Sequence, residues 1–524
     1  MRRAWAPCAA LLLLGATPVT TSQYDNARTG ATLTETVLTP RNVNAGAFGK
    51  IATLTVDGDV YAQPLVVPGL DLPGKGVRGV VFVATEHDSV YAFDASGTDA
   101  APLWHVSFLD PRRGVTAIPF REVSCPFIRP EVGITSTPVI DAAARTLYVL
   151  ARTREQDAGA PPRYVQKLHA LDLRTGAEKL GGPVVVRATI DGKGDGSQNG
   201  KLTFDPLREN PRASLLLANG TLYLSWASSC DVGPYHGWVM AYDARSLEQI
   251  AAFSTSPDAD DAGVWQADTG PAADADGNVF VVTGNGAFDA APRGGRDFGD
   301  SVLRLVRTGR ELAVRDFFTP SDQARLNAED GDLGSGGPLL LPDQPGPHRR
   351  LLVLGGKGGT FYVIDRDAMG GFRPGSNAHA VQTIASPGSV FGAAAYWSGH
   401  LFVLWSGDVL KDFALRGGRL SASPVARAAD RFTDPGATPT VSANGTRDGI
   451  VWVIESRGFR APDRPAVLRA YEAANVAHVL YASEQQPERD RAGTALRFTI
   501  PTVADGRVYV GTKGQLDVYG LLSH

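Results

Sequence analysis

The stretch VYAFDA at residues 90–95 recurs along the chain, as LHALD at 168–172, VMAYDA at 239–244, FYVID at 361–365 and LRAYE at 468–472. Weaker copies lie at residues 303–306, 410–415 and 516–521. Self-similarity at a period of tens of residues indicates an array of repeated supersecondary units. The chain therefore contains eight copies of one unit.

Each unit is built from strands. The first copy is preceded by VVFVATEHDSV and, before that, by AQPLVV, and similar pairs precede the other copies. Turn residues such as ANGT, DADGN and ADGR join the two members of a pair, as hairpins require. We therefore predict an all-β, eight-bladed β-propeller, with seven blades as the competing arrangement. The spacing exceeds the ~40–45 residues of a WD40 blade, so several blades carry long loops.

The two ends of the repeat array are complementary. The last copy, at residues 516–524, is one strand short of a complete blade, and residues 48–56 (FGKIATLTV) form an unpaired strand before the first complete repeat. Pairing these two segments would close the ring and leave no open sheet edge. Residues 23–524 are thus expected to form a single propeller domain.

The first 22 residues have the pattern of a secretory signal peptide. Arg2 and Arg3 precede an apolar run to about Ala16, and small residues follow. Cleavage is expected between Ala16 and Ser22, and Cys8 would leave with the leader. No other segment is apolar and long enough to span a membrane. We therefore expect an exported protein, periplasmic or extracellular.

Net charge and cysteine content limit the possible binding partners and indicate one cross-link. The net charge of −4 provides no basic surface for nucleic acid, which is excluded as a partner. Of the 3 cysteines, Cys125 and Cys230 remain after the leader, and an even pair in an exported protein indicates a disulfide. Two unrelated buried thiols are the alternative. If both cysteines line one mouth of the ring, the bridge would tie together the loops that cover it.

The repeats resemble those of the pyrroloquinoline quinone (PQQ) dehydrogenases, eight-bladed propellers with the quinone and calcium over the central channel. The resemblance covers nearly all of the chain after the leader. It implies PQQ and calcium as cofactors and a small alcohol or sugar as substrate. Scaffold propellers share these repeats without binding a cofactor, so particular motifs must decide.

Two motifs correspond to the calcium ligands of that family. VVTGNGAFDAAPRGGRDFGDS resembles its TGN segment, whose Asn ligates calcium; this is Asn285, and Asp300 fills the following GD position. SSCDVGPYHGWVMAYD places Asp231 where the family has Glu, close to Tyr235 and His236, either of which could face substrate. Oxygen ligands suit calcium. An Asn-Gly turn and an Asx turn are the structural alternatives.

Two further motifs correspond to the base and to a quinone contact. FFTPSDQARLNAEDGDLGSGG aligns Asp332 with the general base that takes the alcohol proton, although Gly331 replaces the family's Trp; a solvated acidic loop is the alternative. RRLLVLGGKGGTFYVIDRD aligns Lys357 with the basic residue that contacts the quinone oxygens. Asp365 is expected to belong to the blade tip instead.

Some family features are altered. In the family, a Trp lies beneath the quinone ring; Trp265 lies two residues from the position that aligns with it. The family's pair of adjacent cysteines is missing. Glu131 and Arg129 could point into the channel mouth, and Glu131 is taken as a cofactor contact. No CxxCH motif is present, so electrons would leave to a separate acceptor.

Three functional hypotheses follow. The leading one is a PQQ-dependent oxidoreductase acting on an alcohol or sugar. The alternative is a non-catalytic scaffold that binds protein or glycan at the cell envelope, which predicts that Asp231, Asn285, Asp332 and Lys357 do not converge. The third is a hydrolase or lyase that uses His236 and an acid.

Overall fold

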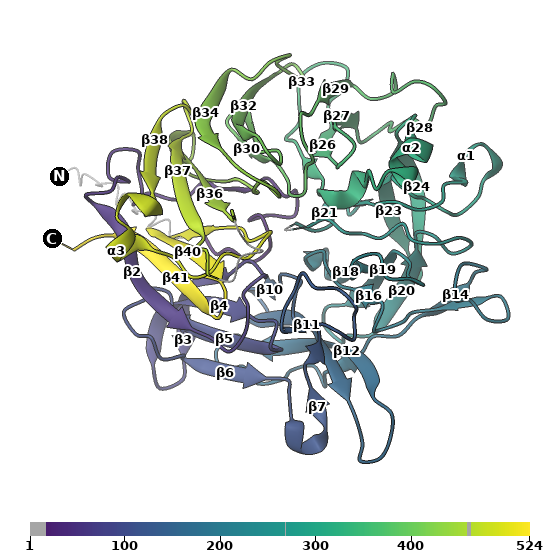
Figure 1. The fold of residues 1–524 in the computed structure, drawn as a ribbon, viewed down its shortest axis with the longest axis horizontal. Helices are drawn as coiled ribbons and strands as arrows, with labels where there is room; N and C mark the ends of the chain where they lie inside the picture. The colour runs from purple at the N-terminus through teal and green to yellow at the C-terminus, as the bar shows by residue number, and fades with distance from the viewer. Residues whose placement is uncertain (1–16, 268, 458–462, 524) are drawn as a thin grey trace, which may run out of the picture.

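Eight antiparallel sheets form a closed ring in the computed structural model, which describes residues 17–267, 269–457 and 463–523 (Figure 1). Each sheet is one blade with four principal strands. The first strands of neighbouring blades contact one another around the centre of the ring. The structure confirms the eight-bladed propeller, and the seven-bladed alternative was wrong.

The strands of the first four blades run from the centre to the rim in chain order. They are β3 (Leu65–Leu72), β4 (Gly76–Ala84), β5 (Ser89–Asp94) and β6 (Trp104–Ser107); β10 (Val139–Asp141), β11 (Thr146–Glu155), β12 (Arg163–Asp172) and β13 (Val184–Val185); β17 (Leu216–Ala218), β18 (Thr221–Ser228), β19 (Trp238–Asp243) and β20 (Gln249–Ser254); β21 (Ala272–Ala273), β22 (Val279–Val282), β23 (Val302–Thr308) and β24 (Glu311–Thr319).

The last four blades repeat this order, except that the outermost strand of the eighth comes from the start of the chain. Their strands are β25 (Leu339–Leu340), β26 (Leu351–Gly355), β27 (Thr360–Asp365) and β29 (Gln382–Ala385); β30 (Ala395–Trp397), β31 (His400–Val403), β32 (Val409–Arg416) and β34 (Ala426–Arg431); β35 (Thr440–Asn444), β36 (Arg447–Glu455), β37 (Val467–Glu472) and β38 (Val479–Ala482); β39 (Thr502–Ala504), β40 (Arg507–Thr512), β41 (Gln515–Leu521) and β2 (Phe48–Thr55).

Short elements decorate the ring. They are β1 (Ala31–Thr32), β7 (Val115–Thr116), β8 (Ile118–Pro119), β9 (Glu131–Val132), β14 (Thr189–Asp191), β15 (Lys201–Thr203), β16 (Glu209–Asn210), β28 (Gly371–Phe372), β33 (Arg419–Leu420), α1 (Ala290–Arg293), α2 (Gln323–Ala328), α3 (Pro487–Asp490), η1 (Pro111–Arg113), η2 (Leu333–Ser335) and η3 (Ser483–Gln485). None of the helices in the described ranges is long and apolar enough to cross a membrane.

The recurring aspartate of the repeat closes the turn after the third strand of a blade. The Asp94 carboxylate accepts the N–H of Ser96, two residues on, at 2.9 Å, and Asp172, Asp243 and Asp365 each accept the same bond. An Asx turn of this kind replaces a backbone hydrogen bond with a side-chain one. The repeat therefore marks the structural tip of the blade, as expected for Asp365.

The ring closes as the complementary ends predicted. Strand β2 pairs antiparallel with β41, with Phe48 opposite Leu521 and Thr55 opposite Gln515. The two strands lie together at the rim, where the two ends of the colour scale meet in Figure 1. Because β2 supplies the fourth strand of the eighth blade, no blade is left incomplete.

Residues 19–35, here called the inner segment, line the centre of the ring. Backbone hydrogen bonds join Val19 to Val66 of the first blade, and further bonds reach the innermost strands of the second, fourth, fifth, sixth and seventh blades in that order. Side chains of the segment reach the third and eighth blades. The segment thus contacts all eight blades. Residues 1–16 of the expected signal peptide lie outside the described residues.

Candidate active site

A cavity of about 480 Å³ lies where the loops after the second strands meet the connections between blades. Both kinds of loop reach the same face of a propeller. The residues that line it are Val123, Cys125, Phe127, Ile128, Val132, Asn210, Arg212, Ser228, Ser229, Cys230, Asp231, Trp265, Ala267, Asp330, Asp332, Ser335, Lys357, Phe391, Asp434, Arg497 and Phe498. Pockets of this size and mixed lining are typical ligand sites.

Four residues that the sequence singled out separately line this one cavity. Asp231 follows β18 in the third blade, and Trp265 lies in the connection to the fourth. Asp332 precedes β25, and Lys357 lies in the turn between β26 and β27 of the fifth blade. Residues up to 126 positions apart are thereby brought together (231 to 357). Of the four residues on which the scaffold hypothesis depends, Asp231, Asp332 and Lys357 line the cavity, and Asn285 does not line it but contacts Asp332. This arrangement counts against the scaffold hypothesis.

Lys357 links two carboxylates. Its Nζ lies 2.6 Å from Asp330 and 2.6 Å from Asp332. Asp332 also accepts the backbone N–H of Asn285 at 2.8 Å, and the Asn285 amide donates to Asp330 at 3.0 Å. Burial raises the pKa of Asp332, and Lys357 opposes the rise. Burial lowers the pKa of Lys357, but Asp332 and Asp330 outweigh it, so that pKa is raised. The acidic loop is therefore part of the site and, at Asp332, is buried instead of solvated.

The side chain of Asn285 has an amide oxygen that accepts no hydrogen bond from the described residues, and this Oδ1 atom is buried. Buried polar atoms are normally satisfied, so this acceptor stands out beside the carboxylates of Asp330 and Asp332. Within the described ranges, no three His, Cys, Asp or Glu side chains are grouped as a metal site.

The carboxylates around this point repel one another. Burial raises the pKa of Asp231, which accepts a hydrogen bond from Tyr235 at 3.0 Å. Burial and the charges of Asp260, Asp231 and Asp332 raise the pKa of Asp261 to about 7. Lys357 is the cation that acts on Asp231. A divalent cation would relieve this repulsion.

The backbone is held close to the site. A Cβ added at Gly284 would lie 2.1 Å from Asp332 Oδ1 and 2.7 Å from the Trp265 ring, so the chain can approach Asp332 only as glycine. Cys230, Asp231 and Asp330 adopt left-handed φ angles of 56°, 53° and 55°. Such conformations cost free energy in residues with a Cβ and gather at functional sites.

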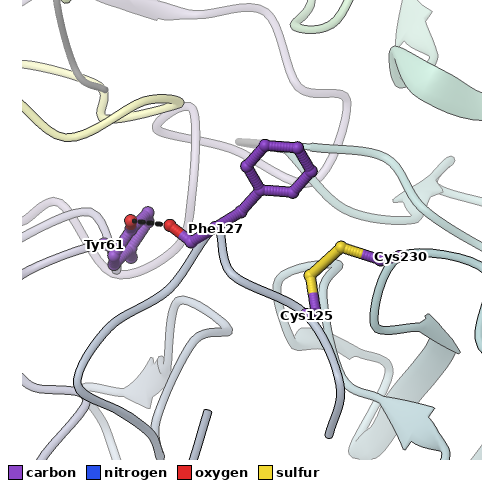
Figure 2. Close-up of a disulfide and its surroundings, with 4 residues drawn as sticks. All are labelled: Tyr61, Cys125, Phe127 and Cys230. Atoms are coloured by element: carbon purple, nitrogen blue, oxygen red, sulfur yellow. Dashed lines mark hydrogen bonds between the residues drawn. A yellow bond between two sulfur atoms is a disulfide. The ribbon is translucent and has the colours of Figure 1, made fainter. Parts of the chain in front are cut away.

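A disulfide forms part of the wall. Cys125, between β8 and β9, is bonded to Cys230 after β18, with a Cα–Cα distance of 5.4 Å (Figure 2). Both cysteines line the cavity, so the predicted bridge is confirmed and ties two covering loops together. Figure 2 also shows Phe127 held beside the bridge, where its carbonyl accepts a hydrogen bond from Tyr61 at 3.3 Å.

Six residues from the sequence analysis do not line the cavity. Asn285 contacts Asp332, Tyr235 contacts Asp231, and Arg129 stacks on the Phe120 ring. Glu131, in β9, is not among the lining residues and pairs instead with His87. His236 is buried, and its two ring nitrogens contact the carbonyl oxygens of Ser256 and Asp195, so it is not free to act as a base. Asp300 lies behind the site, where its carboxylate accepts the Leu333 N–H at 3.0 Å and so supports the Asp332 loop.

The sequence analysis missed the opposite wall. Arg212, Phe391, Arg497 and Phe498 line the cavity and had not been singled out. Each lies just before the innermost strand of its blade, the same place in the repeat as Asp332 before β25. A comparison of this one position across the eight repeats would have found them.

No protein-family model and no curated protein matches the chain. Solved structures do. A quinohemoprotein alcohol dehydrogenase from Comamonas testosteroni is 15% identical, with a TM-score of 0.59 over 96% of this chain and 80% of that one. The fold is that of the quinoprotein alcohol dehydrogenases.

Two further quinoprotein structures agree. A quinohemoprotein alcohol dehydrogenase from Pseudomonas putida has a TM-score of 0.58 at 15% identity, over 96% of this chain and 80% of that one. A europium-containing methanol dehydrogenase has a TM-score of 0.58 at 12% identity, over 96% and 98%. At such identities the similarity establishes the eight-bladed propeller fold, and residue roles must be argued from the cavity itself.

Proposed function

We propose that the chain is an exported PQQ-dependent oxidoreductase that oxidises a small alcohol or sugar at this cavity and passes the electrons to a separate acceptor. The observation that supports the proposal is the convergence of Asp231, Trp265, Asp332 and Lys357 on one cavity. The resemblance assigns each of them a role that needs a common site. The quinoprotein fold of the ring agrees with this assignment.

The residues fit both cofactors. Asp231, Asn285 and Asp332 would hold calcium through oxygen atoms, and the unpaired Oδ1 of Asn285 supports that assignment. The indole of Trp265 and the disulfide would bound a flat ring system. Lys357 would lie beside the quinone oxygens. The cavity of about 480 Å³ has room for a cofactor and a small substrate.

The chemistry divides between cofactor and protein. The bound quinone supplies an acceptor for the electron pair of the alcohol, which the side chains of the chain cannot provide. Asp332 would accept the hydroxyl proton as general base. Lys357, ion-paired with Asp332 at 2.6 Å, would stabilise negative charge that develops beside it. Asp332 is buried in the cavity wall, and Lys357 is partly exposed.

The experiment is a calorimetric titration of PQQ into the calcium-loaded protein. We expect calcium-dependent binding that Lys357→Ala and Asn285→Ala each weaken by about tenfold or more, because each loses a charge-assisted or metal contact. Lys167→Ala is the matched control, since Lys167 forms an ion pair at 2.6 Å with Glu155 outside this cavity. Failure of the folded wild-type protein to bind PQQ with calcium present would falsify the proposal.

A further inference from the structure

A second pocket lies between the first and second blades, toward the rim of the ring and apart from the central cavity. It has a volume of about 210 Å³ and is lined by Phe108, Ala151, Thr153, Lys167, His169 and Pro183, none of which lines the central cavity. A single water needs only about 10–15 Å³ by this measure. The pocket, here called the rim pocket, therefore has room for a small organic molecule.

Strand alternation puts the polar side chains of the rim pocket on one face of the second blade. Residues 147, 149 and 151 of β11 pack in one core cluster with strands of the first blade. Since side chains alternate along a strand, Thr153 of β11 lies on that same face, and so do Lys167 and His169 of β12, which pair with residues 151 and 149. Phe108, which follows β6 of the first blade, covers this face, and its ring stacks on the His169 ring with centres 3.8 Å apart. The rim pocket is therefore formed by two blades together.

His169 has a ring nitrogen without a partner. The residue is 5% exposed, and its Nδ1 lies 2.9 Å from the Glu178 carboxylate, whose other oxygen accepts the Ala170 N–H at 2.9 Å. Because a carboxylate only accepts, Nδ1 carries the proton. Burial lowers the pKa of His169, which favours the neutral ring, and Glu178 opposes the fall. Nε2 is then left with a lone pair, and it has no hydrogen-bond partner within the described ranges.

Two further groups complete the polar set of the rim pocket. Thr153 is 3% exposed, and its hydroxyl oxygen is buried without a partner in the part of the chain that the structure describes. Lys167 donates to Glu155 at 2.6 Å, which uses one of its three N–H groups. A buried polar atom without a partner costs free energy, and the great majority of such atoms have one. Two of them in the wall of one pocket therefore indicate a ligand that satisfies both.

The groups of the rim pocket select a neutral ligand. An anion would be repelled by the lone pair of His169, and a cation would be repelled by the ammonium group of Lys167. A hydroxyl group has both a proton to donate to Nε2 and lone pairs that can accept from Lys167 or Thr153. The remaining, apolar part of the lining suits the C–H faces of a ring that carries several hydroxyl groups.

We propose that the rim pocket binds a neutral polyhydroxy ligand, a sugar ring or a polyol of similar size, through His169, Thr153 and Lys167. One hydroxyl group would donate to His169 Nε2, and a neighbouring one would accept from Lys167. The ligand is bound and not transformed. The site is separate from the oxidation chemistry of the central cavity, so the proposal does not rest on the proposed function.

The experiment needs neither quinone nor calcium. Methyl β-D-glucopyranoside and myo-inositol are titrated separately into protein labelled with nitrogen-15 in its histidines, and the Nε2 resonance of His169, assigned by its loss in His169→Phe, is followed. We expect a saturable shift with at least one probe, and about three- to tenfold weaker binding in Thr153→Val, which removes one neutral hydrogen bond. The control resonance is that of His478, whose Nδ1 also lies 2.9 Å from a glutamate, Glu472, but whose side chain is 64% exposed. It should not move.

Thr153→Val also separates lost binding from lost folding. Because valine has the shape of threonine without the hydroxyl, the thermal midpoint of the ligand-free variant should equal or exceed that of the wild type. Thr383→Val, at an exposed position of β29, is the matched control and should bind the probes as the wild type does. Lys167→Met provides a second test should Thr153→Val not fold.

Three results would overturn the proposal. The first is no shift with either probe, which would leave the rim pocket to water alone. The second is equal binding by the wild type and Thr153→Val. The third is an equal response to tetrahydropyran, which has the six-membered ring but no hydroxyl groups. A protein that binds a probe at the rim pocket but does not bind PQQ would refute the proposed function and leave this proposal standing.

Discussion

Glu86 is a buried carboxyl group whose pKa is set by its surroundings in the fold. It is 2% exposed; one carboxylate oxygen accepts the Gly133 N–H at 2.7 Å and the Thr135 hydroxyl at 3.2 Å. The other oxygen has no partner in the described ranges. Burial raises the pKa of Glu86 to about 7, and the charges of Arg212 and Asp59 act on it in opposite directions. The folded protein therefore keeps this carboxyl group protonated to a higher pH than an exposed glutamate would be.

Glu86→Gln tests that preference. Because the folded pKa lies above the ordinary value of 4.5, the stabilisation from Glu86 is complete below about pH 4.5 and is lost as the pH rises through about 7. Glutamine stays neutral, so the variant should be the more stable protein at about pH 8, by on the order of 3 kcal/mol, and should differ little at about pH 5. Urea denaturation at the two pH values measures the difference.

The control for this prediction is the exposed Glu311→Gln, which should leave the pH dependence unchanged. A Glu86→Gln variant with the wild-type slope of stability against pH would mean that Glu86 is ionised in the folded protein. The sequence could not have indicated this residue, because ATEHDS reads as an ordinary hairpin turn. Its burial arises from contact with residues 133–135 of the next blade.

At the scale of elements, the repeated blade tips could be predicted from the sequence, whereas the shortest innermost strands could not. The recurring tips and the pairing of β2 with β41 were expected and are present. Innermost strands such as β21 and β25 have two residues each, too few to show an alternating pattern. These strands are recognised in the structure by their hydrogen bonds to the next strand of the blade. In the sequence, only their position within the repeat could locate them.

The disulfide joins two such connecting elements, and its removal should be costly. It closes a loop with a sequence separation of 105 residues. In the chain-entropy model, opening a loop of this length lowers the free energy of unfolding by about 4–5 kcal/mol. We expect the double variant Cys125→Ala, Cys230→Ala to show a clearly lower denaturant midpoint than the wild type under non-reducing conditions. Wild-type protein treated with reductant should fall to the same midpoint; an unmoved midpoint in both would contradict the prediction.

At the scale of the whole molecule, ring closure explains why half of the candidate site was predictable. Asp231, Asp332 and Lys357 belong to motifs that a resemblance can align one at a time. The opposite wall of the cavity combines Arg212 of the third blade with Arg497 before the eighth. No family motif marks these two positions; they share only their place before an innermost strand, and the circular arrangement of blades brings them to one cavity.

The inner segment has the same long-range character, and its anchor is Arg28. This side chain is fully buried, and burial lowers its pKa to about 10. Its guanidinium donates to the carbonyl oxygens of Leu215 at 3.3 Å and Pro271 at 3.0 Å, in the third and fourth blades. It also donates to residues of the segment itself, at Thr21 and Ser22.

Arg28→Met should therefore loosen the centre of the ring. Methionine fills a similar volume but leaves the carbonyl groups that Arg28 satisfies buried without donors, at a cost of about 3 kcal/mol or more. The matched control is Arg41→Met, since Arg41 is exposed. Thermal unfolding should give a lower midpoint for Arg28→Met alone, and limited proteolysis should cleave its N-terminal residues first, because the segment is held by bonds that radiate from this side chain. If the two variants unfold and are cleaved alike, the backbone bonds of the inner segment to the blades are sufficient, and the side chain of Arg28 adds nothing to the stability of the ring.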